Sequence, residues 1–284
     1  MNVIMMGKDV AASMKVQLTE TRKELQKHGI NPCLGIIRIG ERPDDLAYEK
    51  GAIKCMSDIG IECETMELAA DITQGALEES FHSMNENPLI HGILLFRPLP
   101  SHLDEEPLKA LINPIKDVDG MSPVNIAKVF TGDDTGYAPC TAEAVMEMLN
   151  YYNINTEGKK VTIIGRSMVV GKPLSILLLN KNATITVCHT RTKNLAEACR
   201  NADILIAAAG KAGMVGSELV GRDAVVVDVG INIVASGKLC GDVDFDSVHK
   251  KAAFISPVPR GVGSVTTTVL AKHVICGAKA SCTQ

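Results

Sequence analysis

A short segment that contains two glycines has the residue types and spacing that suit a phosphorylated ligand. The apolar run 161–164 leads into Gly165, Arg166 and Ser167, and an apolar helical pattern starts at Gly171. Glycine lets a backbone approach a phosphate closely, and the first turn of a helix offers unpaired N–H groups and the positive end of its dipole. We expect these four residues to bind the phosphates of a dinucleotide cofactor. Their spacing differs from G-x-G-x-x-G, so an ordinary strand-to-helix turn is the alternative.

The end of the next predicted strand, over residues 183–188, indicates which dinucleotide is preferred. An NAD site usually has an acidic residue there to bind the ribose hydroxyls, but this chain continues with His-Thr-Arg-Thr. A guanidinium pairs with a phosphate through two parallel hydrogen bonds. We therefore expect Arg166, Thr190 and Arg191 to hold a 2′-phosphate, which makes NADP the expected cofactor and NAD the alternative.

A third polar segment follows the predicted strand over residues 224–229. Asp228 stands near its end, and Gly230, Ile231 and Asn232 come directly after it. Open α/β sheets bind ligands at the carboxyl ends of their strands. We expect the backbone around Ile231 to lie near the nicotinamide ring.

Short apolar runs alternate with helical patterns along the chain, which predicts parallel sheets with crossover helices. The predicted strands are 33–39, 62–68 and 90–96 in the first half and 161–164, 183–188, 203–208, 224–229 and 252–255 in the second. An opening helix over residues 9–28 should end at Gly29, a second at Gly60, and a third should start near Thr73. The fold class is therefore α/β, with an N-terminal α/β domain and a Rossmann-type, doubly wound dinucleotide-binding domain.

A loop rich in turn residues marks the domain boundary. Residues 113–139 contain many Pro, Gly, Asp and Asn residues with little periodicity, so we predict a long ordered loop that leads into a helix capped by Thr141. We place the N-terminal domain at 1–140 and the dinucleotide-binding domain at 141–265. The last helix, over residues 266–284, can pack on either domain.

The composition favours small-molecule partners in the cytoplasm. The 29 basic and 33 acidic residues give a formal net charge of −4, with no run of like charges that would suit nucleic acid or a membrane surface. Nine cysteines are scattered without a Cys-x-x-Cys pair or a spacing suited to zinc, so we expect reduced thiols and no metal. No apolar run reaches the roughly 18 residues of a membrane span.

Several segments, taken in order, resemble one family over nearly the whole chain. The chain is similar to the methylenetetrahydrofolate dehydrogenase/cyclohydrolases, called FolD in bacteria. The matching segments are Tyr48 with Lys54 and Gly60-Ile61, Pro98-Leu-Pro-Ser-His102 with Asp104-Glu105, Lys116-Asp-Val-Asp-Gly120, Pro139-Cys-Thr141, Gly165-Arg-Ser167 with Val170-Gly171, Asp228-Val-Gly-Ile-Asn232, Gly241-Asp-Val-Asp244, and Ser256-Pro-Val-Pro259 with Gly261-Val-Gly263.

This resemblance implies NADP-dependent oxidation of 5,10-methylenetetrahydrofolate to 5,10-methenyltetrahydrofolate by a homodimer. It implies that the N-terminal domain is a folate-cleft domain, which the C-terminal helix joins. It further implies that Tyr48 lies against the pterin and that Asp119 hydrogen-bonds its amino and ring nitrogen groups, so both are our candidate catalytic residues. The blander alternatives are a tyrosine that anchors the edge of the core and an Asp-Gly turn.

Two residues of the family's proton-transfer machinery are missing. The family has a lysine one helical turn after the tyrosine and a glutamine in the strand before Pro-Leu-Pro, and here these positions hold Ala52 and Phe96. Lys50 and Lys54 flank Ala52 but point away from it on a helix. Adding water to the methenyl carbon to give 10-formyltetrahydrofolate needs a proton-transfer group, whereas hydride transfer needs mainly positioning. We hypothesise a dehydrogenase with weak or no cyclohydrolase activity.

Three alternatives stay open at this point. The first is the full bifunctional dehydrogenase/cyclohydrolase, with a water or another residue in place of the lysine. The second is a non-catalytic dimer that binds folate or nucleotide, which the intact glycine turn disfavours. The third is a dehydrogenase for a related reduced pterin, because a fold does not fix the substrate.

A further departure from the family lies in the loop that follows residue 255. Arg260 and Ser264 stand where the family usually has glycine and proline. An arginine tolerates a positive φ poorly, so we expect this loop to have a changed backbone.

Overall fold

The chain forms two compact units, each built from two separate pieces of the sequence. A computed structural model describes residues 2–234 and 237–281. The first unit, called here the six-stranded unit, comprises Met1–Ala12 and Pro139–Thr266, and the second, the three-stranded unit, comprises Ser13–Ala138 and Thr267–Gln284. Helix α1 (Gly7–Lys27) and helix α10 (Thr266–Ser281) run from one unit into the other.

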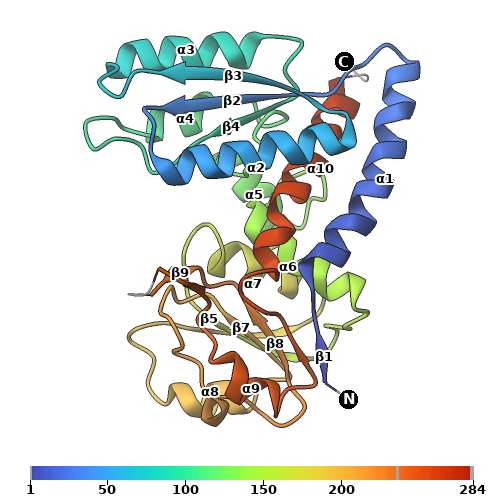
Figure 1. The fold of residues 1–284 in the computed structure, drawn as a ribbon, viewed down its shortest axis with the longest axis vertical. Helices are drawn as coiled ribbons and strands as arrows, with labels where there is room; N and C mark the ends of the chain where they lie inside the picture. Colours follow the sequence, from blue (N-terminus) through green and yellow to red (C-terminus); the bar gives the residue numbers. More distant parts are fainter. Residues whose placement is uncertain (1, 235–236, 282–284) are drawn as a thin grey trace. The chain divides into compact units, whose positions relative to one another are not determined.

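The three-stranded unit is a small parallel sheet covered by helices. Its strands are β2 (Cys33–Ile39), β3 (Glu62–Leu68) and β4 (Gly92–Leu95), in the order β3-β2-β4. Every residue of β2 is buried, as expected for a central parallel strand covered on both faces. Helices α2 (Pro43–Ile59), α3 (Gln74–Glu86) and α4 (Glu106–Leu111) accompany the strands (Figure 1).

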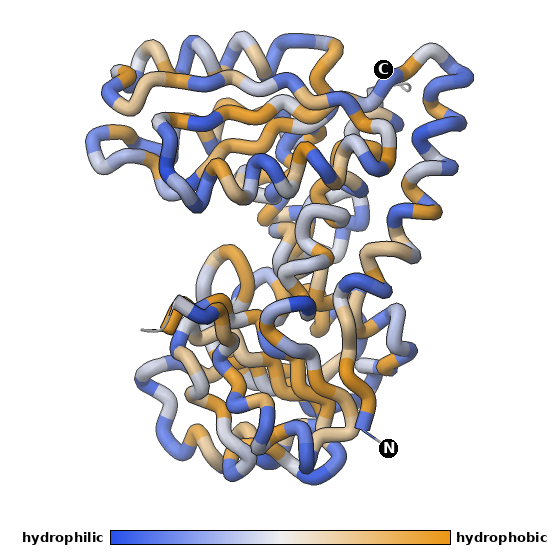
Figure 2. The backbone as a smooth tube through the Cα atoms, in the orientation of Figure 1, coloured by the Kyte–Doolittle hydropathy of each residue, from blue (hydrophilic) through white to orange (hydrophobic). Residues whose placement is uncertain are grey.

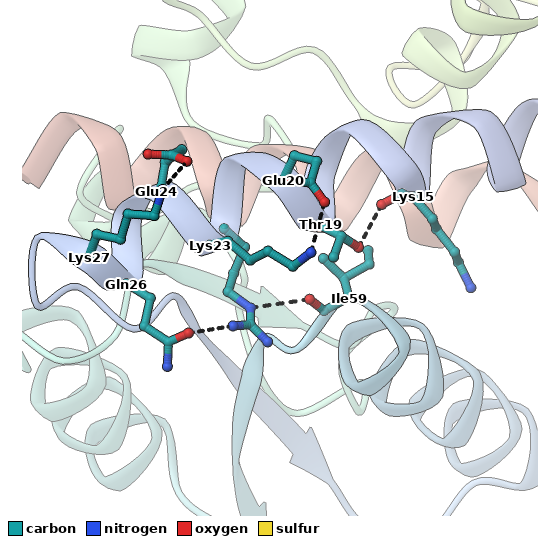
Figure 3. A network of polar contacts seen from close by, with 9 residues as sticks. Lys15, Thr19, Glu20, Lys23, Glu24, Gln26, Lys27 and Ile59 are labelled. Carbon is teal, nitrogen blue, oxygen red and sulfur yellow. Dashed lines mark hydrogen bonds and ion pairs between the residues drawn. The ribbon is translucent and has the colours of Figure 1, made fainter.

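The helix boundaries in this unit follow the capping residues. Gly60 ends α2 with φ +85°, and the hydroxyl of Thr73 accepts a hydrogen bond from the N–H of Ala76 at the start of α3. Arg22 of α1 donates to the Ile59 carbonyl oxygen (3.2 Å), and Figure 3 draws this contact among the polar contacts of α1. These predicted helix ends are confirmed.

The predicted long loop over residues 113–139 contains a helix, so that prediction is wrong in part. Helix α5 (Pro123–Thr131) begins after Ser122, whose hydroxyl accepts from the N–H of Asn125, and ends at Gly132 with φ +78°. The helix has under three turns, which is too short for a clear 3.6-residue pattern. The Ser-Pro pair and the later glycine were nevertheless a readable start and stop signal.

The predicted N-cap Thr141 is also wrong. Helix α6 (Cys140–Tyr151) begins two residues earlier than expected, and Pro139 occupies the N-cap position without a side-chain hydrogen bond. The extended backbone of Pro139, with ψ 132°, already leads the chain into the helix. Thr141 therefore lies within the first turn.

The six-stranded unit contains a parallel sheet with the order β1-β11-β8-β7-β5-β6. Figure 2 shows hydrophobic residues concentrated along its central strands. The strands are β1 (Val3–Ile4), β5 (Lys160–Ile164), β6 (Thr184–Cys188), β7 (Ile204–Ala207), β8 (Val225–Asp228) and β11 (Phe254–Ile255). Helices α7 (Gly171–Leu179), α8 (Leu195–Arg200) and α9 (Phe245–His249) connect them, beside a small antiparallel pair of β9 (Asn232–Ile233) and β10 (Leu239–Cys240).

Strand β1 was not predicted from the sequence. Val3 pairs with Phe254 and Ile4 with Ile255 in parallel register, which places the start of the chain in the six-stranded unit. A strand of two residues leaves no alternating pattern to read. The six-stranded unit thus includes residues 1–12, which the predicted domain 141–265 does not. The predicted limits of the two domains stay a prediction.

Helix α10 packs within the three-stranded unit beyond its first residue. A Cβ at Gly277 would lie 2.1 Å from the carbonyl oxygen of His91, so the missing side chain allows a close approach of the helix to the segment before β4. His273 Nδ1 bonds the carbonyl oxygen of Val118 at 2.7 Å, and its ring stacks on Tyr137. Within the described ranges, no helix combines the length and apolar content needed to cross a membrane.

Candidate active site

The glycine turn lies at the carboxyl end of β5, where the chain enters α7. Gly165 has φ +131°, and a Cβ there would lie 2.1 Å from the carbonyl oxygen of Ala208. A Cβ at Gly171 would lie 2.1 Å from the carbonyl oxygen of Gly165. Both positions therefore require glycine. The hydroxyl of Ser167 accepts a hydrogen bond from the N–H of Val170 (3.1 Å), which shapes the turn before the helix.

The three residues predicted to hold a 2′-phosphate lie at one edge of the sheet. Ile164 and Cys188 are register partners at the ends of β5 and β6, and Arg166, Thr190 and Arg191 follow shortly after them. All three side chains are exposed. In the described part of the chain, neither arginine forms an ion pair with a carboxylate, so both guanidinium groups can pair with a phosphate.

The turn that carries Arg191 is fixed by local hydrogen bonds. The N–H of His189 donates to Thr192 Oγ1 at 2.8 Å, and the N–H of Arg191 donates to His189 Nδ1 at 3.1 Å. The imidazole of His189 thus accepts a hydrogen bond from the backbone. Its observed role is to shape the turn.

Asp228, at the end of β8, bonds backbone groups of neighbouring segments. Its carboxylate accepts hydrogen bonds from the N–H groups of Gly230, Asp242 and Val243, each at 3.0 Å. The carboxylate is buried and fully used within the protein, so it fixes the loop after β8. Asn232, which follows Asp228 closely in the sequence, also has a structural role, because its Nδ2 donates to Asp242 Oδ1 at 2.9 Å.

Asp242 is a residue that sequence reasoning missed. It is fully buried and accepts from three consecutive backbone N–H groups, those of Ala209, Gly210 and Lys211, at 2.6, 2.9 and 2.7 Å. Asp242 thereby shapes the loop that follows β7 at the carboxyl edge of the sheet. Its presence in a segment shared with the family was the available signal.

Asp228 should make stability depend on pH. Burial raises the pKa of Asp228 to about 6 from 3.8, and repulsion from Asp242 adds to the shift. Because the pKa of Asp228 is higher in the folded than in the unfolded state, the folded state takes up a proton first as the pH falls. The free-energy cost of burying the ionised carboxylate therefore disappears as the pH falls through about 6. When the pH is lowered from 7 to 5, we expect the free energy of unfolding of wild type to rise by about 1 kcal/mol relative to that of Asp228→Asn.

Urea unfolding of both proteins at the two pH values measures this difference. Comparison with the asparagine variant cancels the contributions of all other titrating groups. An unfolding free-energy difference that stays the same at both pH values would contradict the assignment.

A cavity of about 260 Å³ lies beside Ile231, which is 66% exposed, and Arg260 and Gly263 also line it. The expectation that an arginine would change this backbone is wrong, because Arg260 has φ +81°. Its carbonyl oxygen accepts from the N–H of Gly7 at 2.8 Å, which helps to hold the loop in that conformation. A left-handed arginine costs on the order of 1 kcal/mol.

The three-stranded unit places Tyr48, Ala52 and Phe96 together. The rings of Tyr48 and Phe96 meet edge to face, with centroids 5.8 Å apart and an interplanar angle of 84°. Ala52 is fully buried and Phe96 is 8% exposed, whereas Tyr48 is 38% exposed. Apolar groups therefore occupy both positions where the family has a lysine and a glutamine, while the tyrosine edge stays accessible.

The two lysines near Ala52 do not replace the missing one. Lys54 forms an ion pair with Asp58 (3.5 Å) one turn further along α2, and its side chain is 78% exposed. Lys50 is also exposed. The prediction that both lysines face away from Ala52 is confirmed.

The two aspartates of the Asp-Val-Asp-Gly segment have different surroundings. Asp117 is fully buried and accepts from the N–H groups of Met121 (2.9 Å) and Ser122 (2.8 Å) and from Asn125 Nδ2 (2.8 Å). Burial raises the pKa of Asp117, and these hydrogen bonds oppose the shift. Asp117 thus forms the turn, which leaves Asp119 as the accessible carboxylate.

Asp119 has a partner that sequence reasoning missed. Arg97 Nη2 lies 2.5 Å from Asp119 Oδ2, and the two side chains are 22% and 26% exposed. The two residues are far apart in sequence, and no local pattern joins them. The available signal was the position of Arg97, directly after the unusual Phe96.

The chain has a parallel sheet with a glycine turn at its carboxyl edge. It also has a second α/β unit that carries a tyrosine and an accessible carboxylate. Together these features define a two-unit, dinucleotide-dependent enzyme. Profiles of the tetrahydrofolate dehydrogenase/cyclohydrolase family match the chain twice. The catalytic domain matches residues 5–119 and the NAD(P)-binding domain residues 139–282. The chain belongs to this family, which confirms the resemblance and the α/β fold class.

Known relatives agree with this assignment over almost the full length. The "Bifunctional protein FolD" of Clostridioides difficile is 52% identical over 276 residues, which cover 97% of this chain and 96% of that protein. The bifunctional FolD enzyme of Campylobacter jejuni superposes with a TM-score of 0.96 at 39% identity, covering 99% of each chain. A Trypanosoma brucei FolD structure, complexed with NADP and an inhibitor, superposes at 0.94 with 37% identity, covering 100% of this chain and 99% of that one.

Proposed function

We propose that this enzyme oxidises 5,10-methylenetetrahydrofolate to 5,10-methenyltetrahydrofolate with NADP as the hydride acceptor. Family membership and the NADP held by the Trypanosoma brucei relative support this proposal. The observation that carries the cofactor choice is the pair of unpaired, exposed arginines, Arg166 and Arg191, at one sheet edge without an acid. NAD is the alternative cofactor.

The proposed division of labour follows the two units. The predicted folate-cleft domain, residues 1–140 with the helix 266–284, supplies Tyr48 against the pterin and Asp119 as an acceptor for its N–H groups. The predicted dinucleotide domain, residues 141–265, supplies Gly165, Arg166, Ser167, Gly171, Thr190 and Arg191 for the phosphates and Ile231 beside the nicotinamide. When bound, NADP supplies the carbon that accepts the hydride. The chain's own residues position both ligands, which is the main requirement of this step.

We further propose that the cyclohydrolase step is weak. Hydrolysis of the methenyl product needs a group that moves protons, and Ala52 and Phe96 offer only a methyl group and a phenyl ring beside Tyr48. The names of the relatives favour the alternative, a full bifunctional dehydrogenase/cyclohydrolase. In that case a bound water or another residue would replace the lysine.

One experiment tests both steps. Purified protein is mixed with methylenetetrahydrofolate and either NADP or NAD, and reduced cofactor and methenyl product are followed together. We expect reduction of NADP with methenyl product that decays at its uncatalysed rate. Rapid conversion to the formyl form would establish the bifunctional enzyme, and no reduction of either cofactor would favour a non-catalytic binding protein or a different reduced pterin as substrate.

We propose a homodimer in the cytoplasm, as the family resemblance and the reduced cysteines suggest. The described cysteines are all free thiols. Sedimentation of the purified protein measures the assembly, and a monomer at micromolar concentration would overturn the dimer.

A further inference from the structure

The ion pair between Arg97 and Asp119 places a hydrogen-bond donor group directly beside an acceptor group. Arg97 follows β4 and Asp119 lies in the segment after it, and Nη2 and Oδ2 are 2.5 Å apart. A guanidinium has five N–H donors and no acceptor, while an ionised carboxylate only accepts. Both side chains keep a solvent-accessible part, so a ligand can reach the pair.

We infer that Arg97 is a specificity-determining residue, which reads the carbonyl group of the pterin while Asp119 reads the neighbouring ring N–H. This inference rests on the proposed folate substrate. A lactam edge presents a donor, the ring N–H, next to an acceptor, the 4-oxo group. The carboxylate and the guanidinium are the complementary acceptor and donor, in the same adjacent arrangement.

Both members of the pair are anchored from outside the pair. Asp119 follows Val118, whose carbonyl oxygen is held by His273 Nδ1 at 2.7 Å. Arg97 precedes Pro98, whose carbonyl oxygen accepts from Arg42 Nη1 at 2.8 Å. The backbones that carry the two charges are thus fixed before a ligand arrives, which lowers the entropic cost of recognition.

The guanidinium retains donors for a ligand. Within the described residues, the contact with Asp119 is the hydrogen bond that Arg97 makes, and it uses one of the two terminal nitrogens. Asp119 Oδ1 is likewise left for the pterin. Because an arginine stays protonated, Arg97 cannot replace the missing lysine in proton transfer, and its role is recognition.

Two stable probes that differ at one position test this role. Folic acid carries the 4-oxo group and the neighbouring ring N–H, whereas aminopterin, its 4-amino analogue, presents an amino donor to the guanidinium and has no hydrogen on that ring nitrogen. Because the chain has no tryptophan, calorimetry is the suitable binding measurement. For wild type we expect folic acid to bind roughly ten times more tightly than aminopterin or better, since one N–H donor would face another.

Arg97→Met should reduce this preference by about threefold or more and leave the part that Asp119 contributes through the ring N–H, and Arg97→Lys should restore part of the loss, because an ammonium still donates but lacks the planar fork. In turnover, Arg97→Met should raise KM for methylenetetrahydrofolate about tenfold while KM for NADP and kcat change less than threefold. Arg222→Met is the matched control, since Arg222 is exposed and belongs to the six-stranded unit.

The outcomes separate the inference from the proposed function. If wild type oxidises the folate but Arg97→Met keeps the full preference for folic acid, the inference is wrong and the proposed function stands. If wild type binds neither probe, and reduces neither NADP nor NAD when 5,10-methylenetetrahydrofolate is supplied, the proposed function fails. A fall of kcat with unchanged KM values in a folded Arg97→Met protein would also overturn the recognition role.

Discussion

Replacing Ala52 with lysine and Phe96 with glutamine together should raise hydrolysis of 5,10-methenyltetrahydrofolate by roughly 10²- to 10⁴-fold, the usual contribution of a positioned proton-transfer group. Ala52 lies one helical turn after Tyr48, and the ring of Phe96 packs against Tyr48 (centroids 5.8 Å apart). A lysine at 52 alone would enter a fully buried apolar position without a polar partner. The glutamine removes the ring and gives the ammonium a hydrogen-bond acceptor.

Stopped-flow decay of the methenyl chromophore measures this gain. Ile53→Lys with Phe96→Gln is the matched control, because it adds the same charge on the next residue of α2, where the side chain is exposed. We expect no gain in the control and a small one in either single variant. A folded Ala52→Lys, Phe96→Gln protein without faster hydrolysis would show that these two positions do not explain the missing activity.

Removal of both arginines at the proposed 2′-phosphate site should have the second large effect. We expect Arg166→Ala with Arg191→Ala to raise KM for NADP by roughly 100-fold, since each charge-assisted hydrogen bond contributes about 1.5–3 kcal/mol. KM for NAD, which lacks the phosphate, should change less than about threefold. Initial-rate measurements with both cofactors at saturating folate give the two values.

Arg222→Ala serves as the control for loss of a cation from the same unit, because Arg222 is exposed and pairs only weakly with Asp223 (3.7 Å). The wild-type preference for NADP should also weaken as salt rises, through screening of an exposed phosphate site. Equal losses with NADP and NAD would mean that the arginines support the fold or the pyrophosphate and do not read the 2′-phosphate.

Much of the fold could be predicted because its strands are short segments that are mostly apolar, as in β2, or that mix polar and apolar residues, as in β3. Strand β2 was expected at 33–39 and β3 at 62–68, and both have these limits. The end of α2 could also be predicted, because the left-handed conformation that ends a helix favours glycine. Short elements escaped detection. Strand β1 exists only through pairing with β11, a contact across almost the full chain that no local pattern encodes.

Less of the candidate site could be predicted, because its geometry depends on distant contacts. The glycine turn was visible since strand, glycine and helix follow one another directly. The pairing of Arg97 with Asp119 and the three N–H groups bound by Asp242 depend on how loops fold back. Asp119 could therefore be predicted from the sequence, but its partner Arg97 could not.

The division of each unit between the two ends of the chain has a consequence for synthesis on the ribosome. The six-stranded unit needs both β1, made first, and β11, made near the end, before its sheet has all its strands. The three-stranded unit needs α10, which is made after all the other elements of that unit. During synthesis the chain therefore carries two incomplete cores at the same time, because the first lacks β11 and the second lacks α10 until residues 254–281 have been made.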